Sequence, residues 1–151
     1  MGVRLCAGAL AALVGLIHAA CAGQPIYPVI SPPAATAFRA PHEAVWNATL
    51  QSLGIVPPAV VDPAQGHIVT GQFTYDMPVQ GGGMRGGGAF IQILRVSMDI
   101  LVHPAPDGTT TVRAQTTIHD AQQYGFWPGA GGPNSPEGDL FARIASHLAG
   151  R

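Results

Sequence analysis

The chain contains no lysine and few charges of either sign. Its seven basic residues are all arginine, its acidic residues number eight, and charged residues make up 10% of the sequence. A protein that binds nucleic acid needs a dense basic patch, and attraction to anionic lipid headgroups needs a similar basic cluster beside the membrane. Because the sequence has neither cluster, we expect no nucleic-acid partner and no electrostatic attraction to a membrane.

Cysteine is almost as rare. The two cysteines are Cys6 and Cys21, so the chain is not a small domain held together by several disulfides. Cys6 lies inside an apolar run near the N-terminus. If this run is a cleaved leader, its removal also removes Cys6. Cys21 is then the single thiol of an exported protein, and a lone free thiol in an oxidising compartment requires an explanation.

The motifs of common catalytic and metal sites are missing as well. The sequence holds neither the GxSxG turn of a serine nucleophile nor the HExxH spacing of a zinc protease. The glycine-rich segment 81–88 lacks the Lys-Ser/Thr ending of a phosphate-binding loop. The histidines after the leader fall on different predicted elements: His42, His67, His103, His119 and His147. We therefore predict a protein that is not an enzyme, with no catalytic residues, no metal site and no cofactor.

The first 20 residues have the layout of an export signal. Arg4 is the single charge before a run of Leu, Ala, Val, Gly and Ile, and small residues follow at Ala19 and Ala20. This layout predicts a secretory signal peptide over residues 1–20. The run is at the short end of the roughly 17–25 residues that span a bilayer. A retained membrane anchor and a plain cleaved signal, with Cys21 incidental, are the alternatives.

The small residues followed by Cys21 resemble the lipobox of bacterial lipoproteins, although His18 stands where that family usually has Leu. In that family the cysteine thiol is acylated with diacylglycerol and becomes the first residue of the mature chain. The resemblance implies lipidation of Cys21, which accounts for the lone thiol, and a membrane partner reached through the lipid. By analogy with lipoprotein sorting, Ala22 in place of Asp implies the outer membrane of a bacterial cell envelope, facing the periplasm.

Residues 21–40 read as a tether, because they combine several prolines with alanine and show no periodicity. Such linkers are extended and semi-rigid, at about 3.1 Å per residue. A single domain is expected over residues 41–151, which is long enough for one hydrophobic core.

Two helices are predicted, one at each end of this domain. The first covers residues 41–53, with Pro41 at its first position, an apolar stripe through Trp46, Leu50 and Leu53, and Gly54 as its stop. The second follows Ser135 as N-cap and Pro136 as first residue. Its apolar stripe consists of Leu140, Phe141, Ile144, Ala145 and Leu148.

Four strands are predicted between the helices, over residues 59–62, 67–75, 90–102 and 112–118. The last two alternate apolar and polar residues, which indicates one buried face. With the shortest loop that keeps apolar opposite apolar, Ile100 pairs with Val112 and Asp99 lies opposite Arg113. The simplest packing is an α+β fold (helix, four strands, helix), in which a four-stranded antiparallel sheet carries both helices on one face.

Two loops are candidate partner contacts. The glycine-rich loop 76–88 presents Arg85 at its tip, and the loop 120–134 carries Tyr124, Phe126 and Trp127. The glycine-rich loop is predicted to be a mobile hairpin loop. The three aromatic residues favour a flap that closes one end of the core, and an exposed contact patch for a partner is the alternative.

One further pattern bears on fold and function. The run from Ala40 to Trp46, followed by Leu50, Leu53 and Gly54, and then Asp62 and the run 66–70, resembles the helix-grip domains of small outer-membrane lipoproteins such as BamC. The resemblance implies the α+β fold and a role among envelope proteins. We therefore expect a non-catalytic envelope lipoprotein whose domain binds or scaffolds another envelope component, with an envelope protein as partner. The alternatives are a periplasmic small-ligand-binding module, which uses the space between sheet and C-terminal helix, and an undetected hydrolase.

Overall fold

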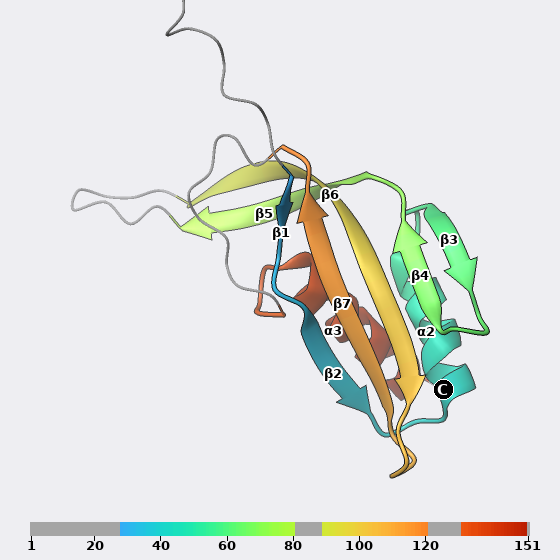
Figure 1. The fold of residues 1–151 in the computed structure, drawn as a ribbon. Helices are drawn as coiled ribbons and strands as arrows, with labels where there is room; N and C mark the ends of the chain where they lie inside the picture. The colour runs from blue at the N-terminus through green and yellow to red at the C-terminus, as the bar shows by residue number, and fades with distance from the viewer. Residues whose placement is uncertain (1–27, 81–88, 121–130, 151) are drawn as a thin grey trace, which may run out of the picture.

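A computed structural model describes residues 28–80, 89–120 and 131–150. These residues form a seven-stranded antiparallel sheet and two helices, shown in Figure 1. The elements, in chain order, are β1 (Val29–Ile30), β2 (Ala34–Phe38), α2 (His42–Leu53), β3 (Pro58–Asp62), β4 (His67–Thr70), β5 (Phe73–Gln80), β6 (Ala89–Pro104), β7 (Thr110–Ile118) and α3 (Pro136–Ala149).

Across the sheet, the hydrogen-bonded strands follow in the order β1, β7, β6, β4, β3. β1 and β2 follow one another along the same edge of β7, and they are separated by Ser31, Pro32 and Pro33. β4 and β5 likewise follow one another along the same edge of β6, on either side of a break at Gly71 and Gln72. Proline donates no backbone hydrogen bond, which explains the first interruption.

The predicted four-stranded sheet is therefore wrong, although the architecture is α+β. Two extra strands, β1 and β2, come from the segment that we expected to precede the domain. The predicted strand 67–75 is divided into β4 and the beginning of β5. β5 also continues to Gln80, into the stretch that we expected to be a loop. Segment 34–38 was missed because its alanines and flanking prolines resemble a linker, yet Ala34 and Phe38 are buried in the core.

The register of β6 and β7 also differs from the prediction. Ile100 lies opposite Ala114 and Asp99 opposite Gln115, a shift of two residues that keeps every side chain on its expected face. The predicted pair of Asp99 and Arg113 is absent, since Arg113 lies opposite Leu101. The turn explains the shift: the Ala105 N–H donates to the Thr109 carbonyl at 2.8 Å, which continues the register in which Pro104 lies opposite Thr110.

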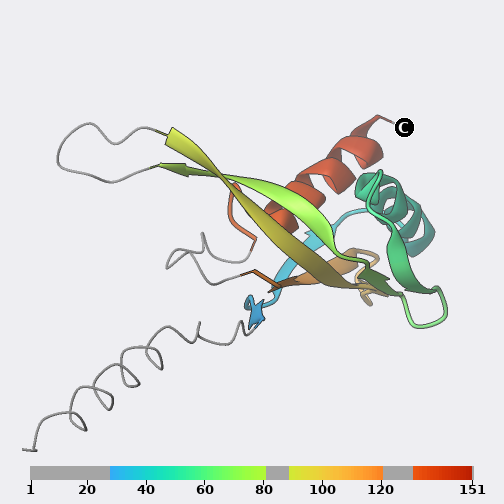
Figure 2. The ribbon, with the colours of Figure 1, turned by 90° about the horizontal axis from the view of Figure 1, so that it is seen from above.

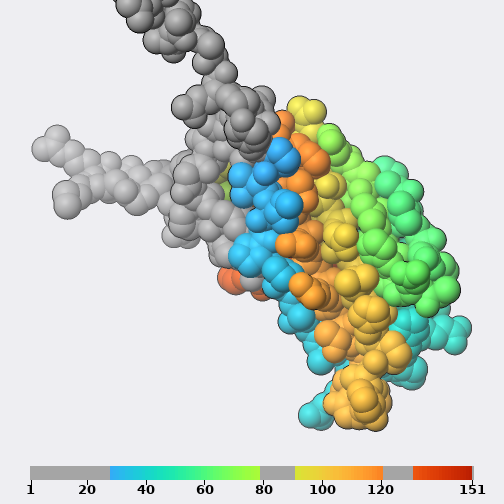
Figure 3. Space-filling model, in the orientation of Figure 1, coloured from blue at the N-terminus to red at the C-terminus, as the bar shows by residue number. Residues whose placement is uncertain are grey.

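Both helices lie on one face of the sheet and pack against each other, as Figure 2 shows. Glycine in the left-handed region follows α2 at Gly54, and the Ser135 hydroxyl caps α3 by accepting from the Gly138 N–H at 3.1 Å. The main core lies between the helices and the sheet and includes Val45, Ile100 and Ile144. The opposite face of the sheet, here called the outer face, is shown in Figure 3.

A long hairpin leaves the body of the sheet. β5 and β6 pair from Phe73 with Val96 to Gln80 with Ala89, whereas pairing of β6 with β7 ends at Val96 and Ile118. Residues 74–80 and 89–95 thus form a two-stranded extension, here called the ribbon, which projects beyond the body in Figure 2. A smaller apolar cluster lines its inner face and includes Met77, Leu94 and Val96.

Candidate functional site

The outer face of the ribbon carries two exposed isoleucines. Ile91 and Ile93 are 67% and 65% exposed, while Gln92 and Leu94 between and beside them are buried. Half-buried antiparallel strands normally place polar residues on their solvent face. Neighbouring apolar side chains on such a face therefore indicate a binding surface.

The residues opposite the isoleucines define the rest of this patch. Pro78 of β5 pairs with Ile91, and Asp76 of β5 pairs with Ile93. Both β5 residues are exposed. The patch is thus an apolar group of Ile91, Ile93 and Pro78 with one carboxylate at its margin.

The ribbon also has backbone edges without a partner strand in the described part of the chain. β3 lies beside β4 and stops there, where the Gly71 N–H donates to the Pro57 carbonyl at 2.8 Å. No described strand continues beside β5, and β5 is the one described strand that pairs with β6 over residues 89–95. Such free edges and exposed apolar side chains are features that proteins otherwise suppress.

A hollow of about 370 Å³ lies at the base of the ribbon. Its lining includes Thr74, Ile93, Arg95 and Asp120. The Arg95 Nε donates to the Asp120 Oδ2 at 3.1 Å, and both side chains are largely exposed. An exposed ion pair of this kind contributes less than about 1 kcal/mol to the free energy of unfolding. The hollow continues the exposed surface of the ribbon at its base.

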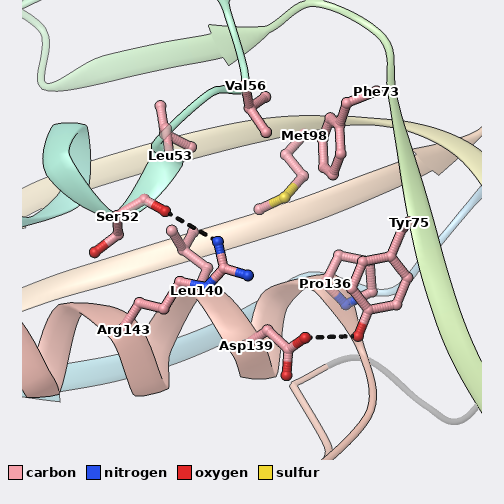
Figure 4. Close-up of a pocket in the computed structure, with 10 residues that line it drawn as sticks. All are labelled: Ser52, Leu53, Val56, Phe73, Tyr75, Met98, Pro136, Asp139, Leu140 and Arg143. Carbon is pink, nitrogen blue, oxygen red and sulfur yellow. Dashed lines mark hydrogen bonds between the residues drawn. The ribbon is translucent and has the colours of Figure 1, made fainter.

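A second depression lies between the helices and the sheet, as Figure 4 shows. The Tyr75 hydroxyl donates to the Asp139 Oδ2 at 2.9 Å, and the Arg143 Nη1 reaches the Ser52 carbonyl at 3.5 Å. Burial, with the hydrogen bond to Asp139 next, raises the pKa of Tyr75 well above its usual value of 10, so the phenol stays protonated. The volume is about 50 Å³, room for roughly three water molecules.

Two histidines on the outer face of the sheet each contact a polar side chain. The Ser97 Oγ is 2.9 Å from the His119 Nε2, and the His67 Nε2 is 3.1 Å from the Asp99 Oδ1. A serine nucleophile needs a base that a third group orients, but Asp120 binds Arg95 and Asp99 binds His67. Among the described residues, no three His, Cys, Asp or Glu side chains gather as metal ligands.

A buried carboxylate near the start of α3 was missed by the sequence reasoning. Glu137 is fully buried, and its Oε1 accepts from the Ser31 hydroxyl at 2.8 Å. The same hydroxyl accepts from the Thr116 N–H at 2.9 Å. An acidic residue in the first turn of a helix is common, so the position of Glu137 in the sequence gives no signal of this contact. The contacts show that Glu137 ties α3 to β7 and to the segment between β1 and β2.

The structure does not test the predicted site residues. Cys21, Arg85, Tyr124, Phe126 and Trp127 are outside the described residues. The sequence did contain a signal for the ribbon, because residues 90–94 (FIQIL) are apolar at both odd and even positions. No described helix combines the length and the hydropathy that a membrane crossing requires.

Comparison with known proteins assigns no family. No family model matches the chain, and no curated protein matches it in sequence. Among solved structures, Ara h 8.0201 is similar with a TM-score of 0.43 and 9% identity, covering 83% of this chain and all of that one. TTHA0849 from Thermus thermophilus has a TM-score of 0.37 and 11% identity, covering 81% of this chain and 98% of that one. Likeness at this level says nothing of what the chain binds.

Proposed function

We propose that this protein is a non-catalytic lipoprotein of the bacterial cell envelope, anchored through Cys21, whose domain binds another envelope component through the ribbon. The exposed pair of Ile91 and Ile93 carries the proposal. These side chains stand on a projecting element whose edges have no partner strand among the described residues. Exposed apolar side chains and strand edges lower solubility, and a bound partner would cover them.

The anchor is supported by the layout of residues 1–21 and by Cys21 as the one cysteine after the predicted leader. Acylation uses the thiol, which explains a single cysteine in an exported chain.

The alternatives receive less support from the geometry. The predicted ligand-binding module uses the space between the sheet and α3, which is about 50 Å³, whereas a drug-sized molecule needs roughly 300 Å³ or more. The larger hollow at the base of the ribbon lies outside that space and is lined in part by the exposed Arg95–Asp120 pair. A hydrolase needs its nucleophile, base and orienting acid in one chain of contacts. The Ser97–His119 pair and the His67–Asp99 pair remain separate.

The anchor is tested by intact mass. The full chain is expressed in a bacterial host and purified from detergent-solubilised envelopes. We expect a protein that begins at residue 21 and whose mass is increased by that of the acyl groups. We expect the Cys21→Ala variant to carry no acyl group and to be absent from the envelope fraction. A processed protein with an unmodified thiol would contradict the anchor.

The binding surface is tested by cross-linking in intact envelopes. A photoreactive residue in place of Ile91 should yield adducts with an envelope component. The matched control replaces Val61, an apolar residue that is 43% exposed on the edge strand β3, outside the ribbon. Equal yields at the two positions, in a protein that is acylated, would refute binding through the ribbon.

A further inference from the structure

We infer that the component which the ribbon contacts is the lipid bilayer that holds the anchor, with Ile91 and Ile93 at the boundary between headgroups and acyl chains. This inference rests on the proposed function, because it takes Cys21 as the point of attachment. It follows from where the chain leaves the sheet, how far the anchor can reach and which side chains the ribbon exposes.

The N-terminal segment and the ribbon leave the sheet at the same end. Val29 pairs with Ile118, and Ile118 pairs with Val96, the residue at which the ribbon begins. β1 is antiparallel to β7, and β7 is antiparallel to β6, so the beginning of β1 and the ribbon lie at the same end of the sheet. Two strand spacings, or about 10 Å, separate them. Figure 1 shows β1 beside this end of β7.

The reach of the anchor matches the length of the ribbon. Seven residue steps separate Cys21 from Pro28, and even a fully extended chain covers at most about 25 Å over this distance. The free part of β6, from Ala89 to Arg95, spans six residue steps, or about 20 Å at roughly 3.3 Å per step. The anchor therefore keeps Pro28 within about 25 Å of the bilayer, a distance similar to the length of the ribbon.

The exposed side chains at this end fit a lipid interface. Besides the patch of Ile91, Ile93 and Pro78, β1 exposes Val29 and Ile30 near the point where the chain enters the domain. Asp76 stands at the margin of the patch, where it can stay in water. Apolar groups with a polar margin, close to an acyl anchor, favour a shallow position in the bilayer interface. The sparse basic charge means that apolar contact, rather than headgroup attraction, would hold the ribbon there.

The experiment uses the acylated, processed protein in vesicles of phosphatidylethanolamine and phosphatidylglycerol that contain no other protein. Ile93→Cys is labelled with an environment-sensitive NBD dye. The label is unique, because acylation blocks the Cys21 sulfur and Cys6 lies in the removed leader. Ile91→Cys is a second position on the same face, and Val61→Cys is the control. Nitroxide lipids in the vesicles quench a dye that touches the bilayer.

We expect blue-shifted emission and at least twofold quenching at positions 91 and 93, with neither effect at position 61. If the acylated protein floats with the vesicles but positions 91 and 93 behave like position 61, the ribbon does not contact lipid. That result would overturn this inference and leave the proposed function intact, with a protein as the ribbon's partner. If Cys21 carries no lipid and the protein does not float, both proposals fail.

Discussion

Removal of the Ser31 hydroxyl should destabilise the domain severely. This hydroxyl is buried, accepts from the Thr116 N–H at 2.9 Å and donates to the Glu137 Oε1 at 2.8 Å. Ser31→Ala leaves the amide hydrogen and the carboxylate oxygen without partners, and each buried unsatisfied group costs about 1–3 kcal/mol. The expected loss is therefore roughly 2–6 kcal/mol in the free energy of unfolding, out of a total of about 5–15 kcal/mol.

Neighbouring contacts make this a test of the hydroxyl alone. The Ser31 N–H donates to the Thr116 carbonyl at 2.8 Å, and the Gln115 side-chain amide donates to the Ser31 carbonyl. Both bonds use backbone atoms of Ser31 that the substitution keeps. The Oε2 of Glu137 has no hydrogen-bond partner among the described residues, so within this part of the chain the variant would leave both oxygens unpaired.

Urea unfolding followed by circular dichroism measures the loss. Ser146→Ala, an exposed serine on α3, is the control and should change stability by less than about 0.5 kcal/mol. Adding Glu137→Met to Ser31→Ala should restore part of the loss, because replacing both partners by apolar groups removes the stranded carboxylate. A Ser31→Ala variant as stable as Ser146→Ala would refute the role assigned to this cluster.

Two other predictions concern backbone geometry and titration. Gly66→Ala should cost more than about 3 kcal/mol, since φ is +62° and a Cβ would meet the Val102 carbonyl oxygen. Gly54→Ala, with φ +59° and ψ −115° but open space around it, should cost only the backbone strain of about 1–3 kcal/mol; equal losses in urea unfolding would contradict the steric explanation. Because the raised pKa of Tyr75 favours its neutral form in the folded state, the stability from that neutral form is present below pH 10 and is lost as the pH rises further. The stability advantage over Tyr75→Phe should therefore shrink above pH 10 in unfolding curves, and a constant difference would show that the phenol does not titrate as inferred.

The sequence by itself determined the local elements. Pro41 before α2, Ser135 and Pro136 at the start of α3, and a glycine after each helix act within one or two turns. Both helices therefore lie where the pattern predicted them, with α2 beginning one residue later, at His42. The alternation in β6 and β7 likewise determined which side chains face the core, because each strand has a period of two residues. These features require no knowledge of distant residues.

The tertiary structure alone decided how the strands combine. β2 has little strand character in its own sequence and forms because β7 offers an edge along residues 110–114. The register of β6 and β7 depended on the geometry of the turn at residues 105–109, which parity does not specify. Pairings between distant residues are not written in local periodicity, so they were the part of the fold that the prediction missed.

The candidate site shows the same division. The apolar run 90–94 indicated a strand with two apolar faces, but the sequence did not tell which face would be covered. β7 stops at Ile118, and Ile91 and Ile93 stay exposed on the outer face of the ribbon that continues beyond it. Glu137 looked like a residue of any helix start, and it became a buried anchor because Ser31, 106 positions away in the chain, folds against it. Burial is a property of the assembled layers, and for that reason only the tertiary structure could identify these residues.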